Sequence, residues 1–237
     1  MTKCTEVRRL DLGCIVRPAE EAGTAQPRVE PVFAYLVRHA DGLILFDTGI
    51  GAADPETEAH YRPRRRTLQS ALASAGTSAA DVSMVVNCHL HFDHCGGNPL
   101  FRKTPIVVQE AELATARRGD YTIDELVDFP GAGYLEISGE AELRPGIRVI
   151  PTPGHTDGHQ SLVIEQPDGT VILAGQAHDF ATHFALDHAA RQAALDGLEP
   201  PRPTHAAWLD RILAFDPRRV VFAHDSAVWE PPSLPVR

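Results

Sequence analysis

Six consecutive residues, His-Leu-His-Phe-Asp-His at positions 89–94, place three histidines and one aspartate in one short stretch. The stretch follows directly after the apolar, β-like run at 82–88. Crowding such side chains costs desolvation free energy unless a shared ligand holds them together. Imidazole nitrogen and carboxylate oxygen are good ligands for Zn²⁺ and related cations. Residues 89–94 therefore predict a metal-binding loop at the end of a strand.

Two more histidines stand in the same position relative to an apolar run. His155 follows the β-like residues 146–151, and His224 follows those at 218–223. A scaffold of packed sheets can bring the ends of such strands to a common edge. We therefore expect one cleft to be lined by His89, His91, Asp93, His94, His155 and His224.

The elements that would position these loops alternate between β-rich runs and helical segments, which predicts an α/β or α+β fold. Strands are predicted at 32–38, 43–47, 82–88, 105–109, 146–151, 160–165, 170–175 and 218–225. Helices are predicted at 67–75, 110–118, 182–195 and 204–216. Asp41-Gly42 predicts a hairpin turn between the first two strands. Thr204 is the predicted N-cap of the last helix, with Trp208, Ile212 and Phe215 on one face.

Two segments lack a clear period. Residues 1–31 contain several prolines and predict one strand and an irregular loop. Residues 119–146 are rich in glycine and acidic side chains and predict a lid or a cover over a pocket. No repeat and no linker interrupts the chain, so we expect a single domain over residues 1–237.

The size and charge of the chain disfavour some classes of partner. Its 237 residues suit one domain with a sizeable core, and its formal net charge is −10. An acidic surface disfavours nucleic acid or an anionic membrane as a partner. The basic run at 62–66 is interpreted as a solvated helix start. No apolar stretch approaches the roughly 20 residues needed to span a bilayer.

The cysteines give no sign of a secreted framework. They lie at positions 4, 14, 88 and 95 and form no Cys-x-x-Cys pair. The first residues also lack the apolar segment of a signal peptide, so a reducing cytoplasm is the expected compartment. Cys95 is interpreted as a small buried side chain whose soft thiol would be oxidation-prone beside a metal.

These motifs together resemble a known family. The patterns His-x-His-x-Asp-His at 89–94, Thr-Pro-Gly-His-Thr-Asp-Gly-His at 152–159 and Phe-Ala-His-Asp at 222–225, with Phe-Asp-Thr-Gly at 46–49, resemble the metallo-β-lactamase superfamily. Within it, the chain is most similar to the N-acyl homoserine lactonase-like branch, over about Val32 to Asp225. The resemblance implies an αββα sandwich with two metals at one edge of the sheets.

The resemblance also implies a role for each site residue. One metal would be held by His89, His91 and His155, and the second by Asp93, His94 and His224. We expect Zn²⁺, one or two per chain, with Fe or Mn as alternatives because they accept the same ligands. Asp47 would accept a hydrogen bond from a ligand imidazole, and His159 would play a similar supporting role. Simple turn capping is the alternative for both residues.

The implied chemistry is hydrolysis. Two cations a few ångströms apart would lower the pKa of a shared water and polarise a carbonyl oxygen. Asp93 would orient the nucleophile and pass a proton to the leaving group. The resulting hypothesis is a metallo-hydrolase acting on a small ester-like substrate, with a lactone as the best single choice.

Two positions depart from the family pattern. Gln176 stands where the superfamily has an aspartate that bridges both metals, and an amide oxygen is a neutral, weaker ligand. Three hypotheses follow: Gln176 ligates through its amide oxygen, Asp179 substitutes for the missing carboxylate, or one metal is bound loosely. Asp179 in turn stands where lactonases often carry a tyrosine, and an ionised carboxylate cannot donate a hydrogen bond to a substrate. Residues 178–188 would either line the substrate pocket or form an exposed helix face.

Several alternatives stay open. A thioesterase of the glyoxalase II type would use the same metals, although residues 225–237 lack the basic tail that binds glutathione. A metal-bearing binding protein is the non-enzymatic alternative, because Gln176 replaces the bridging aspartate. A β-lactamase, a nuclease and a flavodiiron oxidoreductase fit the histidine set and the acidic charge less well. Trp229 would support a homodimer, or the tail that carries it would pack on its own domain.

Overall fold

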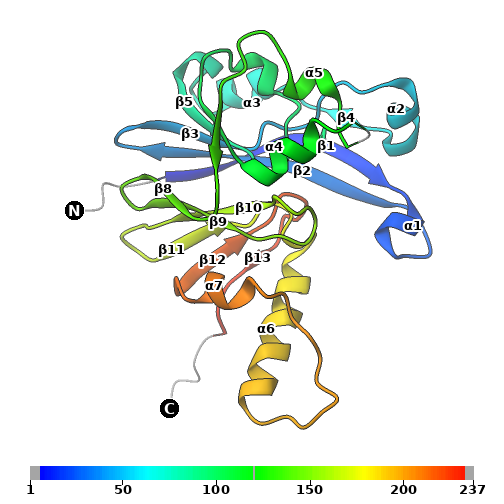
Figure 1. The fold of residues 1–237 in the computed structure, drawn as a ribbon, viewed down its shortest axis with the longest axis vertical. Helices are drawn as coiled ribbons and strands as arrows, with labels where there is room; N and C mark the ends of the chain where they lie inside the picture. Colours follow the sequence, from blue (N-terminus) through cyan, green and yellow to red (C-terminus); the bar gives the residue numbers. More distant parts are fainter. Residues whose placement is uncertain (1–5, 120, 233–237) are drawn as a thin grey trace.

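Two β-sheets stack face to face, with helices on both outer surfaces (Figure 1). The computed structural model describes residues 6–119 and 121–232. Within these ranges, one sheet has the strand order β4-β1-β2-β3-β5-β6-β7 and the other has the order β13-β12-β11-β10-β9-β8. The predicted αββα sandwich of mixed α/β class is confirmed.

The elements are short apart from two long N-terminal strands and one long helix. The first sheet contains β1 (Glu6–Arg17), β2 (Arg28–His39), β3 (Gly42–Phe46), β4 (Arg64–Arg65), β5 (Val82–Val86), β6 (Ile106–Gln109) and β7 (Tyr134–Ile137). The second sheet contains β8 (Ala141–Arg144), β9 (Ile147–Pro151), β10 (Gln160–Ile164), β11 (Thr170–Leu173), β12 (Pro217–Val221) and β13 (Val228–Trp229). The α-helices are α1 (Ala19–Ala22), α2 (Pro55–Tyr61), α3 (Leu68–Ser74), α4 (Glu110–Ala116), α5 (Asp124–Val127), α6 (Ala181–Leu195) and α7 (Leu209–Leu213).

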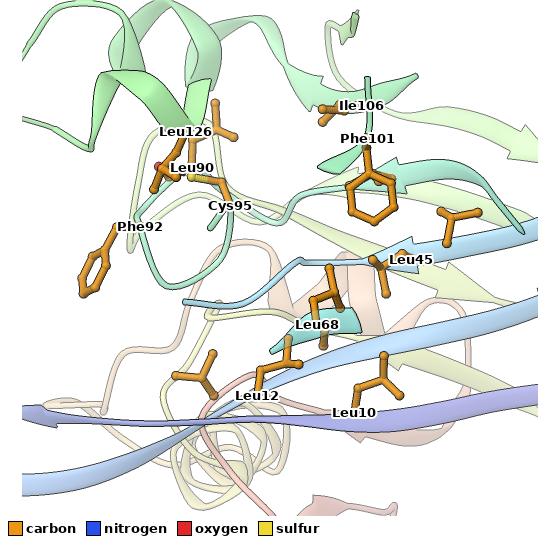
Figure 2. Close-up of a cluster of buried hydrophobic side chains, with 14 of the residues drawn as sticks. Leu10, Leu12, Leu45, Leu68, Leu90, Phe92, Cys95, Phe101, Ile106 and Leu126 are labelled. Atoms are coloured by element: carbon orange, nitrogen blue, oxygen red, sulfur yellow. Dashed lines mark hydrogen bonds between the residues drawn. The ribbon is translucent and has the colours of Figure 1, made fainter. Parts of the chain in front are cut away.

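The layers follow from the two-residue period of the strands. Along β2, Tyr35 and Val37 face the second sheet, whereas Ala34 and Leu36 face the helices on the outer surface. Successive strand side chains point to opposite faces, so a strand that is apolar at every position must be covered on both sides. Figure 2 shows the outer cluster, in which Leu45 of β3 packs with Leu68 of α3.

The second sheet is covered in the same way. Phe184 of α6 is completely buried against its outer face, and the Trp229 ring lies 4.9 Å from the Phe184 ring between centroids. Trp229 is only 7% exposed, so the segment that carries it, β13, packs on its own domain. A homodimer therefore stays a prediction, without support from an exposed Trp229.

Parallel pairing explains why distant loops meet at one edge of the sandwich. β3, β5 and β6 run parallel to one another, so the residues that follow each strand emerge at the same end. β11 and β12 are also parallel, which brings Gln176 and His224 out together. Phe33 donates its backbone N–H to the Ala223 carbonyl at 2.9 Å and thereby joins the two sheets beside this edge.

A buried glutamine joins the sheets a second time. The Gln160 side chain on β10 donates to the carbonyl of Asn87 at 2.9 Å and accepts from Gln109 Nε2 at 2.8 Å. Its backbone N–H donates to the Cys88 carbonyl at 2.8 Å. Gln160 is completely buried, so these bonds replace water that the amide has lost. They hold the start of β10 against residues 87 and 88, which connect the end of β5 to residues 89–94.

The helix predicted at 204–216 is shorter than expected. It begins at Leu209, with Trp208 in the N-cap position, so Thr204 as the N-cap was wrong. Asp187 on α6 explains the difference, because its carboxylate accepts the Ala206 backbone N–H at 2.8 Å. That bond ties the backbone at Ala206 to α6, three residues before α7 begins.

The N-terminal region is more regular than expected. β1 runs over twelve residues, and β2 begins at Arg28 although Pro31 lies within it. Pro31 has no N–H to donate, and a register shift in β1 between Asp11 and Cys14 accommodates it. The basic run at 62–66 does not start a helix: Arg62 is the left-handed C-cap of α2, and Arg64–Arg65 form the exposed edge strand β4. Across the described part of the chain, no helix has the length and apolar character needed to cross a bilayer.

We predict that Gln160→Leu lowers the free energy of unfolding by about 1–3 kcal/mol, because it removes the side-chain donor to the buried Asn87 carbonyl and one of the two acceptors of Gln109 Nε2. Urea denaturation of the metal-free protein measures this effect. Gln192→Leu, at an exposed position of α6, is the control and should change stability by less than about 0.5 kcal/mol. Equal effects of the two substitutions would contradict the proposed role of Gln160.

Candidate metal centre

Three histidines meet in a group that we call the His89 cluster: His89, His91 and His155. Nε2 of His89 lies 3.0 Å from Nδ1 of His91, and Nε2 of His155 lies 3.1 Å from the same atom. One ring nitrogen from each residue falls within 4.8 Å of the other two. Three imidazole nitrogens at this spacing can share one metal ion.

A second group, the Asp93 cluster, consists of Asp93, His94 and His224. The two imidazole Nε2 atoms lie 3.1 Å apart, and Asp93 Oδ2 lies 3.5 Å from each of them. All three side chains are buried. The structure thus brings together, in two adjoining groups, all six residues predicted from the sequence as metal ligands.

The loop at 89–94 turns sharply because its ends are held from inside. The backbone N–H of His94 donates to the His91 carbonyl at 2.9 Å, while Asn87 Nδ2 and the Thr48 N–H donate to the His94 carbonyl at 3.1 and 2.8 Å. Gly96 follows, and a Cβ atom there would lie 1.8 Å from the Gly51 backbone nitrogen. Glycine is therefore required where the loop returns past residues 49–51.

The tautomers of the Asp93 cluster indicate that it fits a cation. Nδ1 of His94 lies 3.0 Å from Asp47 Oδ2, and Nδ1 of His224 lies 2.9 Å from the Pro31 carbonyl oxygen. These oxygens only accept hydrogen bonds, so each Nδ1 carries a proton and each Nε2 faces the centre. Two Nε2 atoms 3.1 Å apart need a proton or a metal ion between them, because two bare lone pairs would repel each other at this distance. The donor set suits a divalent metal ion.

The electrostatics of the two clusters differ. Burial lowers the pKa of His91 to about 4 and of His155 to about 3, so both rings stay neutral near pH 7 and keep lone pairs for a metal. Burial also lowers the pKa of His94, but the carboxylates of Asp93 and Asp47 outweigh it and raise that pKa to about 9. The Asp93 cluster is thus a place where positive charge is stabilised.

Asp47 and His159 lie behind the clusters. Asp47 follows β3 in the left-handed conformation, with φ of 63°, and accepts from the Cys88 N–H at 2.8 Å and from Cys88 Sγ at 3.0 Å as well as from His94. His159 is completely buried and contacts Thr152 Oγ1 at 2.8 Å through Nδ1. Its Nε2 accepts the backbone N–H of Gln176 at 3.0 Å, so it supports the loop of that residue.

Gln176 and Asp179 form a pair at the edge of the Asp93 cluster. Gln176 Nε2 donates to Asp179 Oδ1 at 3.0 Å. Asp179 belongs to neither cluster, because Arg17 Nη1 and Arg28 Nη2 hold its other oxygen at 2.9 and 3.3 Å. Burial raises the pKa of Asp179, but Gln176 and Arg17 outweigh it and hold the pKa below its ordinary value. The structure does not support Asp179 as a substitute bridge.

Glu112 is a site residue that sequence reasoning missed. It is 1% exposed on α4, and its carboxylate accepts the Leu90 backbone N–H and the Thr156 hydroxyl, both at 2.7 Å, and the Tyr121 hydroxyl. Three loops around the His89 cluster thus share one acceptor. The sequence held one sign of this role: Glu112 lies four residues before Ala116 and so shares the apolar, buried face of the predicted helix, where a carboxylate needs hydrogen-bond partners.

A cavity of about 1360 Å³ opens over the two clusters. Its lining includes His91, Asp93, His155 and Gln176, together with residues from the 52–61 and 121–126 segments and from β1. The predicted cover at 119–146 is therefore partly observed. The helix-face residues His178, His183, Asp187 and His188 do not line this cavity. His178 instead lies 3.1 Å from Asp187 and packs against Trp208.

Comparison with known proteins agrees with this arrangement. The sequence profile of the Metallo-beta-lactamase superfamily matches residues 27–224, so the chain belongs to that superfamily. An N-acyl homoserine lactonase from a Bacillus species is 35% identical over 156 residues, which cover 60% of this chain and 62% of that protein. The match thus spans less than two thirds of the length of that relative.

Solved structures extend the likeness across nearly the whole chain. An N-acyl homoserine lactone hydrolase with N-hexanoyl-L-homoserine at its catalytic metal centre has a TM-score of 0.72 at 24% identity and covers 95% of each chain. AidC, a dizinc quorum-quenching lactonase, has a TM-score of 0.65 at 17% identity and covers 98% of this chain and 92% of its own. At these identities the two structures establish the shared fold.

We predict that Asp47→Ala weakens metal binding at the Asp93 cluster by about 10- to 100-fold, because it removes the acceptor that sets the His94 tautomer. Metal retained per chain during dialysis against graded chelator measures the loss. Retention at the His89 cluster should stay near that of the native chain. Asp81→Ala, which removes an exposed carboxylate that caps the short turn at 79–81 away from the cavity, is the control. A retention curve identical to that of the native chain would refute the role of Asp47.

Proposed function

We propose that this protein is a metal-dependent hydrolase that opens a small ester-like substrate, with a lactone as the best-supported class. The carrying observation is a pair of adjoining clusters at the floor of a large cavity: the His89 cluster, where His91 and His155 are neutral near pH 7, and the Asp93 cluster, which stabilises positive charge. The proposed metal is Zn²⁺, one or two per chain, bound by His89, His91, His155, Asp93, His94 and His224. Fe and Mn accept the same ligands.

The bound metals would supply a Lewis acid and lower the pKa of water. Asp93 is ionised, since His94, His224 and His91 outweigh the effect of burial and lower its pKa. Its carboxylate lines the cavity, so it can orient the attacking water and carry a proton to the leaving alkoxide. The amide oxygen of Gln176 would serve as a metal ligand in place of the carboxylate of the family pattern. Asp179 would assist by accepting a hydrogen bond from the other end of that amide.

Arg17 can bind the substrate directly. It is the one lysine or arginine among the described residues that line the cavity, and Asp179 holds its guanidinium at 2.9 Å. A guanidinium has five N–H donors, so others can reach a substrate oxygen. Arg17 would therefore supply the hydrogen-bond donor that the tyrosine of the lactonase pattern provides and that an ionised Asp179 cannot provide.

The charge at the cavity mouth favours a neutral substrate. The lining contains the exposed or half-buried carboxylates Glu21, Asp54, Glu56, Asp124 and Glu125. Such a rim repels anions, and hydrolysis of a neutral lactone produces a carboxylate that the rim would help to expel. A glutathione thioester is anionic, so the rim supports the lactone over the glyoxalase II alternative. A metal-bearing binding protein is the remaining alternative, because Gln176 leaves the centre less negative.

We predict that chelation and His91→Ala each abolish turnover of a panel of neutral lactones, with a loss above 100-fold in kcat/KM. The chelator removes the metal, and His91→Ala removes one of the three imidazole ligands of the His89 cluster. Product acid released at constant pH is the measurement, and His183→Ala on the exposed face of α6 is the control. Turnover that survives both changes would exclude a metal-dependent mechanism. A metal-loaded native chain without turnover would favour the binding protein.

We also predict that Asp124→Asn combined with Glu125→Gln raises kcat/KM for a carboxylate-bearing ester about 3- to 10-fold at low salt, by removing two negative charges from the rim. Turnover of a neutral lactone should stay unchanged. Glu165→Gln combined with Asp168→Asn removes the same charge from a distant surface turn and is the control. If both pairs act alike, the rim does not select substrates by charge.

A further inference from the structure

A chain of polar contacts runs from the cavity wall to the Asp93 cluster. Arg28 donates to Glu30 Oε1 through Nε at 2.9 Å and to Asp179 Oδ2 through Nη2 at 3.3 Å. Its guanidinium also lies 4.4 Å from the centre of the Phe180 ring. Arg17 reaches Asp179 Oδ2 from β1 at 2.9 Å. Two arginines from different strands thus fix one oxygen of Asp179.

The other oxygen of Asp179 determines how the Gln176 amide lies. Asp179 Oδ1 accepts from Gln176 Nε2 at 3.0 Å, and an ionised carboxylate can accept only from the NH₂ end of an amide. The amide is planar, so its oxygen must face away from Asp179. Gln176 is 6% exposed, its backbone N–H is held by His159, and its side chain is hydrogen-bonded with His94.

We propose that Asp179 is a positioning residue: locked by Arg17 and Arg28, it holds the Gln176 amide with its oxygen toward His94, so that a neutral glutamine can serve as a ligand at the Asp93 cluster. The inference rests on the proposed metal centre. It explains why this chain has a carboxylate at position 179 together with an amide at position 176.

The need for such a device follows from the chemistry of the amide. The two ends of a glutamine amide are close to isosteric, but one is an acceptor and the other a donor. A half-turn about the last side-chain bond would present N–H groups to a metal and remove the ligand. A carboxylate has two equivalent oxygens, so the same half-turn changes nothing. Only the amide requires a partner that distinguishes its ends.

The test is a double-mutant cycle read out by metal binding, with Zn²⁺ titrated into the metal-free protein against a competing chelator. Asp179→Ala should weaken the Zn²⁺ equivalent at the Asp93 cluster at least 10-fold and leave the equivalent at the His89 cluster unchanged. In the Gln176→Glu background, Asp179→Ala should weaken neither equivalent. Asp187→Ala, which removes a carboxylate on α6 away from both clusters, is the control and should change neither.

The cycle separates positioning from a general structural role. Equal weakening by Asp179→Ala in the native and Gln176→Glu backgrounds would show that Asp179 acts through the fold, and no weakening in the native background would show that it does not act on Gln176. Either result overturns the inference. A native chain that binds one Zn²⁺ overturns the inference while leaving a mononuclear hydrolase in place. A native chain that binds none overturns the proposed function as well.

Discussion

The buried carboxylate of Asp47 is the interaction on which the candidate centre depends. It accepts hydrogen bonds from the Cys88 backbone, the Cys88 thiol and the His94 imidazole, and so ties the end of β3 to the end of β5. The same contact places the His94 proton on Nδ1 and leaves Nε2 for a metal. The Pro31 carbonyl, on β2 of the same sheet, does the same for His224, which follows β12 of the other sheet. The sandwich thus provides two fixed acceptors, and these decide which nitrogens face the centre.

Gln176 changes the charge of the centre, and the surrounding residues are consistent with that change. A bridging carboxylate would add a negative charge where this chain has an amide. Arg17 and Arg28 lie just beyond it, and Asp179 stands between them and the amide. A cationic guanidinium close to two metal ions would be unfavourable if it were unpaired, so Asp179 both screens Arg17 and leaves it free to donate into the cavity. The departures from the family pattern at positions 176 and 179 therefore form one connected arrangement rather than two separate losses.

Much of this centre could be predicted because its residues follow strands. His89, His155 and His224 each follow an apolar run. β5 and β12 have parallel neighbours, and β9 runs in the same direction as β11, so these positions emerge at one edge. Glu112 and Arg17 could not be predicted in this way, since their roles depend on contacts with loops far along the chain. The start of α7 was missed for the same reason: Asp187 captures the Ala206 N–H from another helix and overrides the local preference of Thr204. The local sequence pattern thus predicts that a helix is present, whereas a long-range hydrogen bond determines at which residue α7 begins.

Glu112 has a consequence for how the site moves. The loops that carry Leu90, Tyr121 and Thr156 are separate in sequence, yet all three donate to this single carboxylate. If one loop withdraws, the acceptor loses a donor while it is still buried, and the bonds to the other two loops lose their geometry. Loss of any one donor therefore weakens the support that Glu112 gives to the other two loops. The loops around the His89 cluster are thus coupled through one buried carboxylate rather than through contacts with one another.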